Sequence, residues 1–342
     1  MLKEKILILK NDRAGDLFTS LTLISSLISA YQNITIYLSE LNIGFSFLFS
    51  KTNIKKINFN LSFINKILIF IDILTNKYHK VYILTPKSYY FFLPLIFRKV
   101  KFYAIVYDNK KNLRPSKFLR KYLYKYKIIY RDKINLKNYH NLQIDLLEDI
   151  SILDSNHLSL SVPIINNQLK ELLPKNFLLF QFRYLFFEKL GWGINEFKYL
   201  MSQIQNKYHF VLFSSDIENN KFSKYFNNYF EDNFSIIDTN TYDKKINAKN
   251  KNIFYLKNIN SFNIFLILKE SEINLAKEGI FSHISYFHKK KCHNLFNFRI
   301  SSKDDIMHEK ISYSEWCKGM NYNFSFLNSD IKKASRKILK NI

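Results

Sequence analysis

The stretch from Lys5 to Leu27 constrains the fold more than any other part of the chain. The apolar run Ile6–Leu9 ends in Lys10 and is followed by a short polar turn. Beyond the turn, apolar residues recur at the spacing of one helix face: Leu17, Leu21, Ile24 and Ile28. A strand, a turn and a helix in this order form the first unit of a doubly wound α/β domain, whose ligands bind at the carboxyl ends of the strands.

The turn carries the first candidate site. It has neither the G-x-G-x-x-G pattern of dinucleotide-binding folds nor the Gly-Lys-Ser/Thr end of a phosphate loop. The order of apolar strand, Lys10, a few residues, Gly15-Asp16 and an apolar helix resembles the amino-terminal motif of glycosyltransferase family 9, the lipopolysaccharide heptosyltransferases. The resemblance implies that Asp16 is the general base on the acceptor hydroxyl, and that Lys10, Arg13 and Gly15 bind the acceptor or a phosphate. Taken alone, Asp16 fits a helix N-cap better than a base.

Strand-like runs and helical stretches alternate along the first half of the chain, which predicts a parallel sheet with right-handed crossovers. The predicted strands are Ile6–Leu9, Ile34–Leu38, Lys56–Phe59, Lys80–Leu84, Lys101–Val106 and Ile128–Arg131. The predicted helices are Asp16–Tyr31, Phe63–Thr75, Ser88–Phe97, Ser116–Tyr124 and Leu142–Leu153.

A second α/β set follows a connection, Ile164–Leu173, that Pro163 and Pro174 bracket. Its predicted strands are Phe177–Phe182, His209–Phe213, Phe234–Ile237, Ile253–Leu256, Ile273–Leu275 and His293–Asn297. Its predicted helices are Ile194–Asn206, Ile217–Tyr229, Ser261–Leu268 and Ile280–Lys289. We therefore expect a GT-B architecture with two Rossmann-like domains whose parallel sheets face each other. Residues 1–163 would bind the acceptor, 175–328 would bind the nucleotide sugar, and a C-terminal helix, 329–342, would cross back to the first domain.

The second candidate motif lies between the strand Phe177–Phe182 and the next helix. In the family that the chain resembles, a lysine closely followed by a tryptophan at a helix entrance contacts the donor phosphate. Lys189 and Trp192 resemble this pair, with a spacing one residue longer. A cation and free amides at a helix N-terminus suit a diphosphate. Taken alone, the two residues favour a solvated charge at a helix end and a tryptophan in the core.

The third motif runs from Glu278 to His283. It is similar to the Asp-Thr-Gly-Leu-Ser-His pattern of the same family: Glu278, Ser282 and His283 match in register, while Gly279 stands one place early. The resemblance implies that these four residues hold the donor diphosphate, ribose or sugar. A single histidine at this place is otherwise more typical of a helix-end residue with its hydrogen bonds satisfied.

A fourth, weaker feature is Asp216 with Glu218 after the strand His209–Phe213. In similar transferases an acidic residue here binds the nucleoside ribose or base, and either residue fits that role. The alternative is a helix N-cap with acids in the first turn. A metal-binding carboxylate pair is set aside because the two-domain layout differs from that of metal-dependent transferases. We expect no metal and no cofactor besides the nucleotide-sugar donor, for which ADP-heptose is one candidate.

Charge points to a polyanionic neighbour. The chain of 342 residues carries a formal net charge of +24, although a sequence rich in Lys, Asn, Ile, Phe and Tyr also arises from AT-rich coding sequence without selection for binding. Between Lys110 and Lys133 there are ten Lys or Arg residues and one acid, interleaved with aromatic residues. This segment suits the anionic surface of an inner membrane or a phosphorylated glycolipid.

The cysteines, the apolar runs and the glycines indicate the cellular setting, the kind of membrane contact and the backbone conformation of the candidate sites. Cys292 and Cys317 form neither a disulfide framework nor a metal spacing, which fits a cytoplasmic setting. The amino terminus does not resemble a signal peptide, and the longest apolar runs, Ile67–Ile71 and Tyr89–Phe97, are too short to span a bilayer, so membrane contact would be peripheral. Four of the six glycines fall in candidate sites, where we expect positive φ or close approach to a ligand: Gly15, Gly191, Gly193 and Gly279.

The combined prediction is an inverting, metal-independent glycosyltransferase. It would move a sugar, for example a heptose, from a nucleotide diphosphate to a lipopolysaccharide core or a related oligosaccharide or glycolipid acceptor. Nucleic acid is not expected as a partner of such an enzyme. Two alternatives stay open: a GT-B transferase with another donor, and a non-enzymatic basic α/β protein that binds anionic membrane or nucleic acid.

Overall fold

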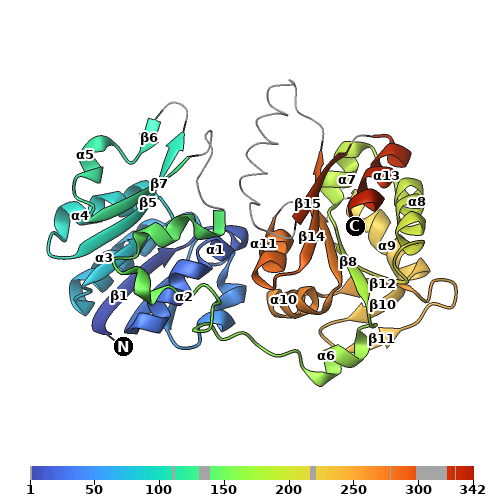
Figure 1. Cartoon of the computed structure of the whole chain (residues 1–342), viewed down its shortest axis with the longest axis horizontal. Coiled ribbons are helices and arrows are strands. Elements are labelled where there is room, and N and C mark those ends of the chain that lie inside the picture. Colours follow the sequence, from blue (N-terminus) through green and yellow to red (C-terminus); the bar gives the residue numbers. More distant parts are fainter. Residues whose placement is uncertain are drawn as a thin grey trace. The chain divides into compact units, whose positions relative to one another are not determined.

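The computed structural model describes residues 2–109, 112–130, 139–215, 221–277, 279–297, 322–327 and 329–342. These residues form two compact units, one up to Pro163 and one from Ile164 onward. Each unit is built on its own predominantly parallel sheet with helices packed against it (Figure 1).

The sheet of the first unit has the order β3-β2-β1-β4-β5-β6, with β7 also paired to β5. All of its pairings are parallel except the one between β5 and β6. The strands are β1 (Leu2–Lys10), β2 (Tyr31–Ser39), β3 (Asn53–Ile57), β4 (Lys80–Ile83), β5 (Lys101–Asn109), β6 (Asn112–Arg114) and β7 (Lys125–Tyr130). Its helices and 3-10 turns are α1 (Ala14–Phe18), α2 (Leu21–Ala30), η1 (Ile43–Phe49), α3 (Phe63–Asn76), η2 (Ser88–Phe92), α4 (Leu93–Ile96), α5 (Lys117–Arg120), η3 (Tyr139–Leu146) and η4 (Ile150–Ile152).

The sheet of the second unit has the order β11-β10-β12-β9-β8-β13-β14-β15. Only the pairing of β10 with β11 is antiparallel among the described pairs. Its strands are β8 (Phe177–Phe182), β9 (Phe210–Ser215), β10 (Ser235–Asp238), β11 (Asp243–Lys245), β12 (Ile253–Lys257), β13 (Ile273–Lys277), β14 (Lys291–Asn297) and β15 (Tyr322–Leu327). Its helices are α6 (Asn167–Leu172), α7 (Tyr184–Leu190), α8 (Ile194–Gln205), α9 (Lys221–Asn233), α10 (Ser261–Glu270), α11 (Ile280–Phe287) and α13 (Ile331–Asn341).

Several predicted elements differ in detail. The single helix expected over Asp16–Tyr31 is two helices, because Thr19 and Ser20 hydrogen-bond to the carbonyl of Asp16 and close α1 early. The stretch Leu142–Leu153 forms 3-10 turns instead of a helix. The sequence pattern also missed α7 and the strands β6, β11 and β15. Residues Ile164–Leu173, expected as a connection, belong to the second unit and contain α6, whose Leu169 is buried.

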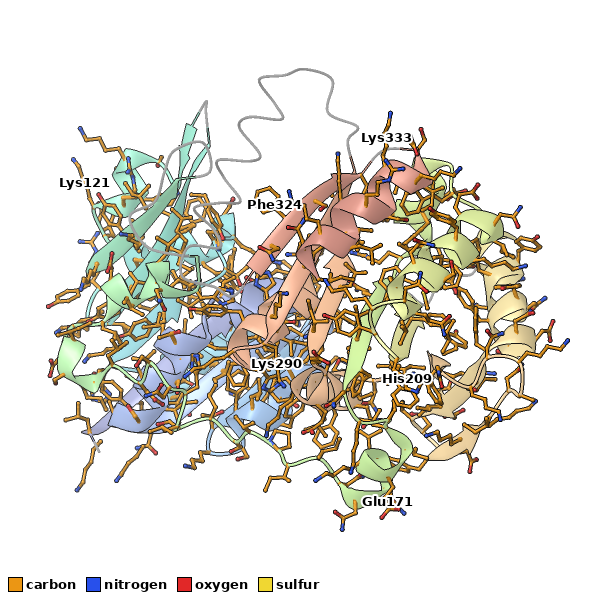
Figure 2. The ribbon with its side chains drawn as sticks, turned by 45° about the vertical axis from the view of Figure 1, so that its right-hand side comes forward. Lys121, Glu171, His209, Lys290, Phe324 and Lys333 are labelled. Carbon is orange, nitrogen blue, oxygen red and sulfur yellow. The ribbon has the colours of Figure 1, made fainter. Side chains whose placement is uncertain are left out.

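The last helix packs on the second unit. Ala334 and Ile338 of α13 lie in the same hydrophobic core as Leu200 and Ile204 of α8. At the C-terminal end of α13, the carbonyls of Leu339 and Ile342 accept hydrogen bonds from Lys207 Nζ. The contacts that position α13 are therefore within the second unit, and a crossing to the first unit stays a prediction. Figure 2 shows Lys333 on its outer side.

None of the described helices is long and apolar enough to cross a membrane. The expectation about glycine is partly right: φ is positive at Gly191 and Gly279, whereas Gly15 lies within α1 and Gly193 has φ −103°. Cys292 is buried and reduced, while Cys317 lies outside the described residues.

Candidate functional site

The first unit places its candidate residues where the chain changes direction across the sheet. After β1 the chain builds β2 and β3 on one side, and it then returns to add β4 and β5 on the other. The carboxyl ends of β1 and β4 therefore flank a topological switch point, the place where open α/β sheets bind ligands. Residues 10–16 follow β1 at this point, and residues 84–87 follow β4.

Lys10 lies inside the unit. Its side chain is 2% exposed, and its Nζ is 2.7 Å from Asp12 Oδ2 and donates a longer bond to the carbonyl of Leu84. A buried ammonium in this ion pair offers no surface to an acceptor or a phosphate. In this structure Lys10 holds Asp12 in place, and its predicted contact with an acceptor or a phosphate stays a prediction.

Asp12 is the residue of this turn that sequence reasoning missed. It is 9% exposed; Lys10 Nζ donates to its Oδ2 at 2.7 Å, and the hydroxyl of Thr85, just after β4, lies near the carboxylate. Burial, reinforced by the negative charge of Asp16, raises the pKa of Asp12 to about 6 against the opposing effect of Lys10. Such a carboxyl exchanges a proton near neutral pH, a property typical of active sites.

A second charged group lies beside Asp12. Burial lowers the pKa of Lys87, although the nearby carboxylates of Asp12 and Glu40 oppose the shift. Its Nζ lies 4.5 Å from the ring centroid of Phe59. A hydrogen bond from the Tyr90 hydroxyl to Asn11 Oδ1, 2.8 Å long, stabilises the turn. The switch point thus combines two carboxylates with a partly desolvated amine.

Asp16 lies in the first turn of α1 and is half-buried. The N-cap of α1 is Arg13, so the alternative of Asp16 as an N-cap is wrong, and its carboxylate remains a candidate base. Arg13 is exposed, which suits contact with an anionic ligand, and Gly15 is helical. These roles of Asp16, Arg13 and Gly15 stay predictions.

The second unit has its own switch point, between β8 and β13. After β8 the chain adds strands on the β9 side and then crosses to add β13 and β14 on the other side. Arg183 follows β8, and Gly279 follows β13 and forms the N-cap of α11. The two come together: a Cβ atom built on Gly279 would lie 3.9 Å from Arg183 Nη1.

The backbone conformation at position 279 requires glycine. Its φ of 152° with ψ −150° belongs to a region that side chains essentially exclude. The first amides of a helix have no intrahelical partner, and they carry the positive end of its dipole. A guanidinium beside such amides is an arrangement that suits a phosphate or diphosphate.

Ser282 and His283 lie in α11 and are buried, with exposed fractions of 0% and 4%. Ser282 Oγ donates to Asn294 Oδ1 of β14 at 2.7 Å, so this hydroxyl fastens the helix to the sheet. Both residues support α11 from inside, and the prediction that they touch the donor is not supported by their burial. Glu278, the predicted acid of the motif, lies outside the described residues.

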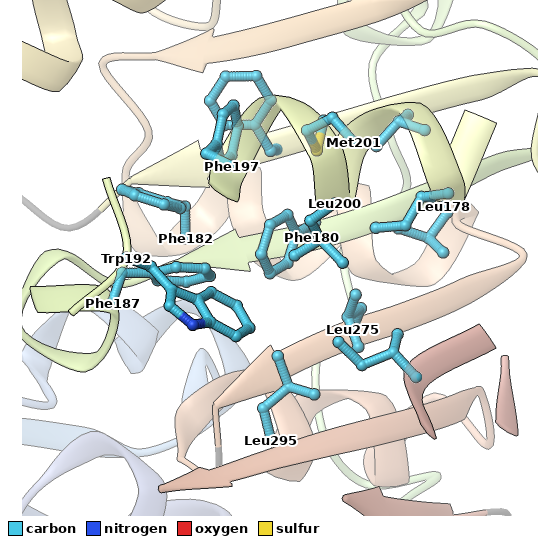
Figure 3. Packing of buried hydrophobic residues seen from close by; sticks show 14 of the residues in the cluster. Leu178, Phe180, Phe182, Phe187, Trp192, Phe197, Leu200, Met201, Leu275 and Leu295 are labelled. Carbon is cyan, nitrogen blue, oxygen red and sulfur yellow. The ribbon is translucent and has the colours of Figure 1, made fainter. Parts of the chain in front are cut away.

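The two residues of the second motif, Lys189 and Trp192, have different surroundings. Lys189 is exposed in the last turn of α7, where its charge complements the negative end of the helix dipole. Trp192 is 1% exposed and packs in the core with Phe187, while its Nε1 donates to the carbonyl of Ser329 at 3.1 Å (Figure 3). The tryptophan is a core anchor in this structure, and the donor contacts expected of Lys189 and Trp192 stay predictions.

Asp216 and Glu218 lie outside the described residues, so their predicted donor contacts stay untested. Within the described ranges no group of three or more His, Cys, Asp or Glu side chains is arranged to hold a metal ion. Arg183 could have been found from sequence as the first cation after a strand expected to be fully buried. Asp12 gave no such signal, because its burial depends on Lys10 turning inward.

Comparison with solved structures identifies the architecture. The structure of Escherichia coli ADP-heptose lipopolysaccharide heptosyltransferase II matches with a TM-score of 0.63 at 10% identity, over 98% of this chain and 97% of that one. A glycosyl transferase of family 9 from Veillonella parvula matches with a TM-score of 0.61 at 11% identity, over 100% and 91%. The chain has a GT-B fold.

The GT-B fold is not confined to transferases. A UDP-GlcNAc 2-epimerase from Methanocaldococcus jannaschii matches with a TM-score of 0.55 at 14% identity, over 99% of this chain and 93% of that one. No protein-family model and no curated protein sequence matches the chain. The predicted fold class is therefore confirmed, whereas the GT-B neighbours, which include both transferases and epimerases of nucleotide sugars, leave the family unresolved.

Proposed function

We propose that this chain is an inverting, metal-independent glycosyltransferase that takes its sugar from a nucleotide diphosphate. The sugar, for which a heptose is the first candidate, would pass to a lipopolysaccharide core or a related glycan. The observation that carries the proposal is the pairing of Arg183 with Gly279 at the start of α11. This arrangement supplies a cation and free amides to a diphosphate, the leaving group of such a reaction.

In the proposed reaction Asp16 takes the proton of an acceptor hydroxyl while the hydroxyl oxygen forms a bond to the anomeric carbon. The bond between that carbon and the diphosphate oxygen breaks, and the electron pair leaves with the nucleoside diphosphate. Arg183 and the α11 amides offset the charge that grows on the departing oxygen. Arg183 replaces Lys189 in this role, because Lys189 lies at the far end of α7.

Within the first unit, Asp12 would keep negative charge next to the base. The charge of Asp16 in turn contributes to the raised pKa of Asp12. The exposed guanidinium of Arg13 would contact an anionic group of the acceptor. The basic segment Lys110–Lys133, of which residues 112–130 are described, would face a phosphorylated acceptor or an anionic membrane surface.

Nucleotide binding tests the proposal directly. We would measure the shift in melting temperature at fixed salt with ADP, GDP, UDP, CDP and their common sugar conjugates. A selective rise with one nucleotide, lost in Arg183→Ala and kept in Lys189→Ala, is the expected result. No nucleotide selectivity, together with polyanion binding that falls steeply with salt, would favour the non-enzymatic alternative.

Product analysis separates transfer from epimerisation. Incubation with the selected nucleotide sugar and a glycan acceptor should release free nucleoside diphosphate only when the acceptor is present. Inversion of a sugar carbon without any acceptor would assign the chain to the epimerase side of the GT-B fold and overturn the proposal.

A further inference from the structure

Helix α3 exposes large apolar side chains along its whole length. On its inner face Ile69 and Ile73 are buried in the core of the first unit, and Asp72 is buried in contact with Lys55. On its outer face six large apolar side chains are between 42% and 75% exposed: Phe63, Ile64, Ile67, Leu68, Ile71 and Leu74. Their spacing places them on one stripe of the helix. A helix on the surface of a globular protein normally presents polar residues there, so this stripe needs an explanation.

The stripe continues onto the neighbouring segment. Tyr89 of η2 donates to the carbonyl of Lys66 at 2.6 Å, and the rings of Phe70 and Phe97 lie 5.1 Å apart, so η2 and α4 lie against α3. Phe92 and Ile96 of this segment are 49% and 59% exposed. Together, these residues form what we call the α3–α4 apolar surface: Phe63, Ile64, Ile67, Leu68, Ile71, Leu74, Phe92 and Ile96.

The charged side chains around this surface are predominantly basic. From Phe63 to Lys101 the sequence contains a single acid, Asp72, and that residue is buried. Among residues 77–99 and 117–121 the exposed Lys, Arg, Asp and Glu side chains are all basic: Lys77, Arg98, Lys99, Lys117 and Lys121. One exposed acid, Glu40, accepts from the Phe59 amide in the loop before α3. Figure 2 shows Lys121 at the outer edge of the first unit. An apolar face bordered by lysine and arginine fits the boundary between acyl chains and anionic headgroups.

We propose that the α3–α4 apolar surface inserts into the interface of an anionic lipid bilayer, with its basic border on the headgroups. A second copy of this chain is a poorer occupant, because its own lysine and arginine residues would meet the same charges across the contact. The proposal does not depend on sugar transfer, since it concerns a surface on the outer side of α3.

The surface also adjoins the candidate site. α3 follows β3, so Phe63 and Ile64 at its start lie toward the carboxyl edge of the sheet, the edge that carries Asp12 and Asp16. The loop before α3 contacts the turn of the site, because Asn11 Nδ2 donates to the carbonyl of Asn58 at 3.2 Å. Insertion of this surface into a bilayer would therefore bring lipid-anchored molecules to the edge of the sheet where Asp12 and Asp16 lie.

Vesicle binding tests the proposal with the full chain. We would measure co-flotation with vesicles of phosphatidylcholine alone and with added phosphatidylglycerol, for the wild type and for the double variant Ile67→Glu/Leu68→Glu. The wild type should bind the mixed vesicles, and the variant should lose about 10- to 100-fold in partition coefficient because two apolar side chains no longer leave water. The matched control is Tyr225→Glu/Ile246→Glu, which changes the charge equally at exposed apolar residues of the second unit and should bind like the wild type.

Three results would overturn the proposal. One is absence of wild-type binding to the mixed vesicles, and another is equal binding by the α3 variant. The third is a concentration-dependent dimer in solution that the α3 variant loses, which would assign the surface to a second copy. Equal melting temperatures of wild type and both variants establish that each is folded, and Ile67→Ser/Leu68→Ser replaces the glutamates if they are not equal.

Discussion

The two units have the same topology at their switch points but differ in the charged side chains that follow the first strand of each. In the first unit β1 leads to two carboxylates, Asp12 and Asp16; Lys10 is paired with Asp12 inside, while Arg13 of the turn is exposed. In the second unit β8 leads to Arg183, which reaches the glycine N-cap of α11. One switch point is suited to accepting a proton and the other to holding an anion. A reaction that removes a proton from one substrate and releases a diphosphate from another needs both.

The surroundings of the two turns differ as well. The turn after β1 depends on polar contacts, with Lys10 paired to Asp12 and Tyr90 bonded to Asn11. The turn after β8 is held by rings: Phe182 stacks on Phe187 with centroids 4.4 Å apart, and Trp192 closes the cluster (Figure 3). Polar contacts respond to pH and charge, whereas aromatic packing does not, so the first turn is the one whose chemistry depends on protonation.

The largest effect is expected for Asp16→Asn. An amide of the same shape cannot accept a proton, and loss of a positioned base slows such reactions by about 10²- to 10⁴-fold. Turnover with the selected nucleotide sugar should fall by that factor, while nucleotide affinity, a property of the second unit, stays within about twofold. The control is Asp243→Asn, an exposed carboxylate on β11. Unchanged turnover in Asp16→Asn would mean that Asp16 is not the base, and the proposed difference between the two switch points would not hold.

The second prediction concerns Asp12 and pH. Its pKa rises from 3.8 to about 6 on folding, so between these values the folded chain binds more protons than the unfolded chain. The stability that Asp12 contributes is therefore complete below about pH 4 and is lost as pH rises through about 6, by up to ~3 kcal/mol. Urea unfolding of wild type and Asp12→Asn across this range should show that slope in the wild type only.

Asp238 of the second unit is a control for Asp12, because its pKa is shifted in the opposite direction. Burial tends to raise the pKa of Asp238, but hydrogen bonds from the amides of Asn240 and Thr241 outweigh it and lower this pKa. Asp238 stabilises the folded chain above the pKa that it has in the unfolded chain, and this stabilisation is lost as pH falls. Its contribution to the free energy of unfolding therefore increases with pH, and Asp238→Asn should remove that increase. Identical slopes in Asp12→Asn and the wild type would mean that Asp12 keeps an ordinary pKa.

The sequence predicted the sheets better than the sites. Strand β8 was predicted with its observed bounds, because a strand buried on both faces is an unbroken apolar run. The turn motifs also placed Asp16 and Gly279 at the starts of the helices that follow β1 and β13, where the structure has them. These features depend on residues close together in the chain, which is where periodicity carries information.

The direction of individual side chains could not be predicted in this way. Lys10 and Trp192 looked like ligand contacts, yet both point inward, since the first finds Asp12 and the second completes an aromatic core. Arg183 meets Gly279 only because β8 pairs with β13, with Ile273 opposite Leu178. That register joins segments far apart in the sequence, and no local pattern encodes it.

The third prediction separates Arg183 from Lys189. Arg183→Ala should weaken binding of the selected nucleoside diphosphate by about 10- to 100-fold, the range for loss of hydrogen bonds to a charged group. Lys189→Ala removes the same charge at an exposed residue of the same helix–turn segment and should change affinity by less than about twofold. Isothermal titration calorimetry at fixed salt measures both. Equal losses in the two variants would mean that net charge, and not the geometry at α11, holds the anion.

The smallest expected effect, and the most local, is that of Gly279→Ala. A methyl group at φ 152° is strained, at a cost of about 1–3 kcal/mol in stability, although space beside Arg183 Nη1 is open to 3.9 Å. Gly193→Ala is the matched control, because Gly193 has φ −103° and its nearest neighbour, Glu196 Oε2, lies 3.5 Å away. Urea unfolding should show the loss in the first variant and little change in the second. If Gly279→Ala also weakens nucleotide binding beyond its loss of stability, the α11 amides lie against the ligand, since the substitution leaves the charge of Arg183 intact. If its affinity is unchanged, Arg183 alone holds the anion, and the second switch point is a cation site without a helix contribution.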